Sequence, residues 1–83
     1  MNKVLVRLYV PIIEESYDIW IPLNRRIYNV IDLIIKAVEE MSGGQYIPTG
    51  NPLLYDKATA KIYNCNLSVR ESNIRNGSEI III

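Results

Sequence analysis

Hydrophobic and polar residues alternate along the first part of the chain. Between Lys3 and Val10 every second side chain falls on the same face of an extended strand, and that face is wholly apolar: Val4, Val6, Leu8 and Val10. The alternation returns from Tyr17 to Ile21, and Pro22 ends it because proline has no N–H for a sheet ladder. Residues 11–16 form the connecting turn, so the pattern predicts an antiparallel hairpin.

The period of the pattern then changes to that of a helix. Apolar residues recur at helical spacing in a single stripe: Ile27, Val30, Ile31, Ile34, Val38 and Met41. Asn24 is the expected N-cap, and Ser42-Gly43-Gly44 is the expected stop, because glycine accepts the left-handed conformation that follows a helix. The stripe predicts one amphipathic helix that covers one face of a sheet.

Short elements and turns follow in the second half of the chain. The expected elements are a loop from Gln45 to Pro52, short strands at Leu53-Leu54-Tyr55 and Lys61-Ile62-Tyr63, a single helical turn around Leu67-Ser68-Val69, a turn at Asn76-Gly77 and a last strand from Ser78 to Ile83.

The last strand constrains the topology. Ile80 to Ile83 are all apolar, and an edge strand of that composition would pair with other molecules and aggregate. We therefore expect it inside the sheet, parallel to the first strand through a right-handed crossover. The sequence predicts an α+β fold with a mixed sheet of four to five strands on one main helix, in a single domain spanning residues 1–83.

Composition narrows the function classes. Nine basic and nine acidic residues leave no net charge to attract nucleic acid or an anionic membrane, and no apolar run reaches the ~20 residues that span a bilayer. Histidine is absent and Cys65 is the only cysteine, which excludes the usual zinc sites and histidine-based triads. We expect no catalytic residues, metal or cofactor, and a cytoplasmic, reducing location.

The order of these elements resembles that of ubiquitin along the whole chain. The local likeness is carried by Leu67-Ser68, Asn73-Ile74, the last strand and the helical start Ile27-Tyr28-Asn29-Val30. The segment Tyr17–Pro22, the apolar helix after it and the Asn76-Gly77 turn are similar to the YukD/EsaB family, ubiquitin-like proteins encoded with bacterial type VII (WXG100 or ESX-type) secretion systems.

That resemblance implies a β-grasp fold and an accessory or regulatory role, with a cytoplasmic component of the secretion machine as the partner. Ubiquitin and the sulfur carriers continue into a flexible Gly-Gly tail, whereas this sequence stops at Ile83 inside the expected strand. We therefore expect neither conjugation nor sulfur transfer. A relative of sulfur carriers or ubiquitin-like modifiers, and a generic β-grasp interaction module, are the alternatives.

The sheet face opposite the helix is the candidate binding surface. Alternation places the following residues on it: Leu5, Arg7, Tyr9, Trp20, Ile81 and Ile83. Exposed apolar and aromatic patches mark partner surfaces, and aromatic residues and arginine dominate interface energetics. We predict that a protein partner binds Arg7, Tyr9, Trp20, Ile81 and Ile83. Two alternatives stay open: the loop from Gly43 to Pro52 covers this face, or a second copy of the chain docks there as a homodimer.

Overall fold

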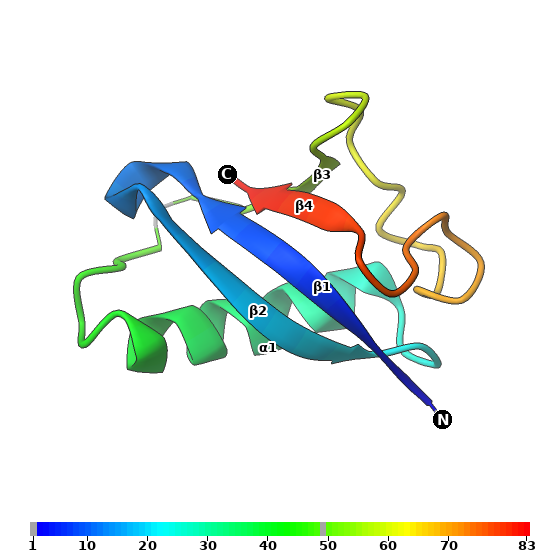
Figure 1. Cartoon of the computed structure of the whole chain (residues 1–83), viewed down its shortest axis with the longest axis horizontal. Helices are drawn as coiled ribbons and strands as arrows, with labels where there is room; N and C mark the ends of the chain where they lie inside the picture. The colour runs from blue at the N-terminus through cyan, green and yellow to red at the C-terminus, as the bar shows by residue number, and fades with distance from the viewer. Residues whose placement is uncertain (1, 49) are drawn as a thin grey trace.

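The computed structural model describes residues 2–48 and 50–83, so Met1 and Thr49 of the predicted loop lie outside the described residues. A mixed four-stranded sheet lies in front of one long helix (Figure 1). The elements are β1 (Lys3–Val10), the 3-10 turn η1 (Pro11–Ile13), β2 (Glu15–Pro22), α1 (Ile27–Met41), β3 (Leu54–Asp56) and β4 (Glu79–Ile82). The predicted α+β class is confirmed.

The first two strands form the predicted antiparallel hairpin. Their register runs from Lys3 opposite Pro22 to Val10 opposite Glu15. β1 has the predicted bounds, but β2 begins two residues before the predicted start. The turn is tighter than expected, because Glu14 adopts a left-handed φ of 53° and its N–H donates to the Pro11 carbonyl. The chain therefore reverses early enough for Glu15 and Ser16 to pair with β1.

The last strand lies inside the sheet, as predicted. The strand order is β2-β1-β4-β3, and β4 runs parallel to β1 and antiparallel to β3. Leu8 on β1 and Leu54 on β3 lie beside Ile80 and Ile82, and all four side chains are buried. The apolar strand is thus protected on both edges, which is the arrangement that keeps such a sequence from pairing with other molecules.

The core lies between α1 and the inner face of the sheet. The apolar face predicted for β1 is buried, as are Ile21, Ile80 and Ile82 on the neighbouring strands, whereas Ile19 is only partly buried. The predicted helical stripe is also buried except for Met41, which is 44% exposed in the last turn. Further core residues come from the chain between β3 and β4: Val69 and Ile74.

The prediction that Asn24 caps the helix is wrong. The residue at the N-cap position is Arg26, and its side chain makes no capping hydrogen bond. The side-chain oxygen of Asn24 instead accepts a hydrogen bond from Nε of Arg70 at 3.0 Å. The Ile27 N–H at the start of α1 donates to the Leu67 carbonyl at 2.9 Å. The next N–H, that of Tyr28, is at a position where a capping side chain usually binds, and it donates to the Cys65 carbonyl at 3.2 Å.

The strand predicted at Lys61-Ile62-Tyr63 is reduced to an isolated bridge between Ile62 and Tyr55. Ala60 has a left-handed φ of 61°, which interrupts the extended backbone just before this segment. The helical turn predicted around Leu67-Ser68-Val69 lies slightly later. It is a turn in which the Ser72 N–H donates to the Ser68 carbonyl at 3.2 Å.

Candidate protein-binding face

Within the described residues 2–48 and 50–83, no segment covers the outer face of the sheet. Figure 1 looks onto this face, with α1 behind the strands. Trp20 on β2 is 54% exposed, Ile83 after β4 is 68% exposed, and the Arg7 side chain is 55% exposed. Tyr9 and Ile81 are half-buried beside them. All five predicted binding residues therefore lie on the same side of three neighbouring strands.

A row of alternating charges crosses the middle of this face. Arg7 on β1 lies 3.4 Å from the carboxylate of Asp18 on β2, and Lys57 lies 3.3 Å from Glu79 on β4. Arg7 and Glu79 are also register partners in the parallel pair of strands. The signs therefore alternate across the sheet in the order Asp18, Arg7, Glu79, Lys57. All of these side chains are about half exposed, so each ion pair contributes only about 0.2–1 kcal/mol.

The charged row divides the apolar surface into two groups. Leu5 and Trp20 are cross-strand partners on one side of the row. On the other side, Ile81 lies between Tyr9 of β1 and Tyr55 of β3. The sequence pattern predicted a continuous apolar and aromatic patch, and it could not place the charged row because the row exists only once four strands are in register. Arg7 belongs to this row rather than to either apolar group.

Residues 45–48 and 50–52 after α1 pass the end of the sheet and do not cover this face (Figure 1). Tyr46 leaves the loop and enters the core, where it is only 6% exposed. Its N–H donates to Oγ of Ser42 at 3.0 Å, just beyond the helix. Neither the sequence period nor a motif predicted this anchor. The only signal for it in the sequence is an apolar pair, Tyr46-Ile47, between a glycine pair and a proline.

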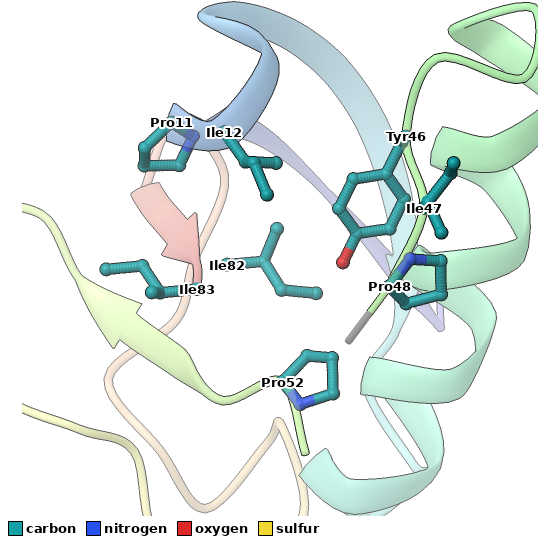
Figure 2. Close-up of a pocket in the computed structure, with 8 residues that line it drawn as sticks. All are labelled: Pro11, Ile12, Tyr46, Ile47, Pro48, Pro52, Ile82 and Ile83. Carbon is teal, nitrogen blue, oxygen red and sulfur yellow. The ribbon is translucent and has the colours of Figure 1, made fainter. Parts of the chain in front are cut away.

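Beside Tyr46 there is a pocket of about 230 Å³. It is lined by Pro11, Ile12, Tyr46, Ile47, Pro48, Pro52, Ile82 and Ile83. In Figure 2 the Tyr46 hydroxyl points into the space between Ile82 and the two loop prolines. Burial and, secondarily, the Glu39 carboxylate raise the pKa of Tyr46 above its ordinary value. The pocket adjoins the outer face at Ile83, which belongs to both.

The potential metal ligands and the single thiol were the other candidates for chemistry in the described part of the chain. Within residues 2–48 and 50–83, no three residues of the types that bind metals come together as a cluster. The Cys65 thiol is partly buried against the core and lies 3.9 Å from the Tyr63 carbonyl. In the same described residues, no helix combines the length and the hydropathy needed to cross a bilayer. The outer face and the adjoining pocket are thus the candidate site.

Solved structures of known proteins share this arrangement of strands and helix. The ubiquitin-like domain of EccD5 from Mycobacterium xenopi matches with a TM-score of 0.82 and 16% identity, over 100% of this chain and 94% of that one. The chain has the ubiquitin-like fold. The ubiquitin-like domain of the type VII secretion protein ECCD1 from Mycobacterium tuberculosis matches with a TM-score of 0.79 and 13% identity, over 100% and 99% of the two chains.

The ubiquitin-like fold of this chain also matches part of a larger assembly. A chain in a MycP5-free ESX-5 inner membrane complex has a TM-score of 0.80 and 16% identity, and the match covers all of this chain but only 21% of that one. A chain in a toluene 4-monooxygenase complex matches too, with a TM-score of 0.74 and 12% identity, so the likeness shows the fold alone. No family model and no curated protein matches the sequence.

Proposed function

We propose that this chain is a ubiquitin-like accessory or regulatory protein of a type VII secretion system. It acts by non-covalent binding of a protein on the cytoplasmic side of the machine. The proposal joins two lines of support. The resemblance to YukD/EsaB proteins points to such a system, and the ubiquitin-like domains of secretion proteins EccD5 and ECCD1 have the same fold over the full length of this chain.

The observation that carries the binding role is the exposed aromatic and aliphatic surface on the outer sheet face. Trp20 and Ile83 are each more than half exposed on a rigid sheet, although burying a large apolar side chain normally stabilises a protein by about 1.5–3 kcal/mol. An indole on a rigid strand also loses little conformational freedom when a partner covers it. We propose Arg7, Tyr9, Trp20, Ile81 and Ile83 as the partner-binding residues.

Replacement of Trp20 by alanine tests the role of this face. Trp20→Ala should reduce affinity for the partner by about 2 kcal/mol, roughly thirtyfold in Kd, because an exposed indole is a typical interface hot spot. Tyr28→Ala is the matched control, since Tyr28 is an aromatic residue of similar exposure (48%) on α1, behind the sheet. Both variants should retain cooperative unfolding, because neither side chain belongs to the core.

The measurement uses the intact chain as bait for proteins from a bacterium with a type VII system, followed by mass spectrometry and by calorimetry with the captured protein. The proposal requires that a component of the secretion machine is captured, and that the loss of affinity is specific to Trp20→Ala. Equal affinity of the wild type and Trp20→Ala for the captured protein would show that the outer face is not the binding surface. A C-terminal adduct or thiocarboxylate on the chain isolated from cells would favour the modifier or sulfur-carrier alternative.

A further inference from the structure

The strand β2 is an open edge of the sheet along its whole length. It pairs with β1 over eight residues and has no strand on its other side. The opposite edge of the sheet differs. There β3 is only three residues long, and its backbone already bonds to the following segment, with the Tyr63 N–H donating to the Leu54 carbonyl at 2.9 Å. β2 is therefore the one edge in the described residues that offers a full-length template for another strand.

The pattern of backbone hydrogen bonds between β1 and β2 shows which N–H and C=O groups of β2 point away from β1. The Leu23 N–H donates to the Asn2 carbonyl at 2.7 Å, which identifies these two residues as a hydrogen-bonded pair. Along an antiparallel strand, residues whose backbone groups bond to the neighbouring strand alternate with residues whose backbone groups point away from it. On β2 the backbone groups that point outward therefore belong to Ser16, Asp18, Trp20 and Pro22.

Two further observations support this assignment of the outward-pointing residues. The Arg7 N–H donates to the Ser78 carbonyl on the β4 side, so the even-numbered residues of β1 are the ones that bond to β2. Pro22, which has no N–H, falls at an outward position, where edge strands tolerate proline. Ser16, Asp18 and Trp20 are all exposed, and no other described residue bonds to their backbone N–H groups.

The charge of this edge selects the kind of strand that can bind. The acidic residues Glu14, Glu15 and Asp18 lie on or beside β2, and the sequence has no lysine or arginine between Arg7 and Arg25. A second copy of β2, paired antiparallel in the register centred on Asp18, would place the two Asp18 carboxylates opposite each other, which destabilises a strand pair. An arginine-bearing strand would instead meet Asp18, whose side chain is 61% exposed although Arg7 lies 3.4 Å from its carboxylate, and its guanidinium groups could stack on the exposed Trp20 indole.

We propose that β2 binds an extended, basic segment of a protein partner, which adds a fifth strand to the sheet. The inference rests on the proposed protein-binding function and adds to it a contact at the edge of the sheet beside Trp20. Main-chain hydrogen bonds to Ser16, Asp18 and Trp20 hold the segment, and its alternate arginine or lysine side chains contact Asp18 and Trp20. This mode of recognition takes affinity from the backbone and selectivity from every second side chain.

Amide hydrogen exchange provides the test. The probe is a synthetic peptide of alternating threonine and arginine with the eight-residue length of β2, and its matched control alternates threonine and glutamate. In the free protein the Ser16, Asp18 and Trp20 amides should exchange fast, whereas those of Tyr17, Ile19 and Ile21 should be protected. The basic peptide at saturation should slow the three outward amides about tenfold, as expected for newly formed hydrogen bonds.

The variant Ser16→Pro adds a second readout. It removes one outward N–H at a position where an edge strand accepts proline, and it should weaken the basic peptide at least threefold, whereas Ser16→Ala should not. Absence of protection at saturating basic peptide, or equal protection by the acidic peptide, would overturn the inference whether or not Ser16→Pro folds. If Trp20→Ala still weakens binding of the secretion partner in that case, the proposed function is supported, and only the addition of a strand at β2 is wrong.

Discussion

Tyr63 shows how burial alters the chemistry of a single residue. Its ring is packed against the core, and burial raises the pKa of the phenol from 10.0 to about 12, with a further contribution from the Asp56 carboxylate. Both causes disfavour the phenolate, because a negative charge is costly in an apolar environment and beside another negative charge. The phenol therefore remains protonated in the folded protein over a pH range in which it ionises in the unfolded chain.

We expect this residue to make folding stability fall at alkaline pH. Because the folded pKa is the higher one, the contribution of Tyr63 is fully present below pH 10 and is lost as pH rises towards about 12. Urea unfolding at a series of pH values should show this decline, and Tyr63→Phe should make it shallower. An equally steep decline in the phenylalanine variant would show that Tyr63 does not cause it.

At the scale of the element, α1 shows that position on the helix decides the effect of a substitution. Ile34 is 1% exposed and contacts the core, whereas the preceding Leu33 is 45% exposed. The two residues have the same side-chain volume and helical backbone, so they differ mainly in burial. Helical periodicity alone predicted this difference, since Ile34 lies in the apolar stripe and Leu33 does not.

Alanine at these two positions should therefore have very different effects. Ile34→Ala should lower the free energy of unfolding by about 2–5 kcal/mol, because it removes buried methyl groups and leaves a cavity. Leu33→Ala should change it by less than about 0.5 kcal/mol, as is usual for exposed sites. Chemical denaturation followed by circular dichroism measures both, and equal losses would contradict the burial assigned to α1.

At the scale of the whole molecule, β1 and β4 join the two ends of the sequence. The Leu5 N–H donates to the Asn76 side chain at 2.8 Å, and the Gly77 N–H donates to the Leu5 carbonyl at 2.8 Å. These bonds span about seventy residues of sequence, so closing them costs chain entropy that only the completed core offsets. The central pair of strands should accordingly be the last part of the native structure to open.

Native-state amide exchange should reveal this order. We expect the slowest exchange in β1 and β4, where strands lie on both sides, and fast exchange in residues 45–48 and 50–52 and at the outward amides of β2. Slow exchange at the outward amides of β2 without any added peptide would mean that this edge is already covered in solution, which would contradict the open edge seen in the structure.

Most of the fold could be predicted because the decisive signals are local. The two-residue period of β1, the helical stripe of α1 and the apolar run of β4 each follow from burial of one face or both faces of an element. The errors fall where the decisive contacts are distant. Asn24 was expected to cap α1, but the carbonyls of Cys65 and Leu67 accept from the first N–H groups of the helix, and no local pattern contains that information.

The features of the candidate site also divide into those that the sequence predicted and those that only the structure shows. The sequence by itself determined which residues of β1, β2 and β4 share the outer face, because alternate side chains of a strand always point to the same side. Only the tertiary structure decided that Arg7 falls in a row of alternating charges, that Tyr46 turns inward beside a pocket, and that β2 lies at an open edge. These features depend on strand order and register, which are set by packing between segments far apart in the chain.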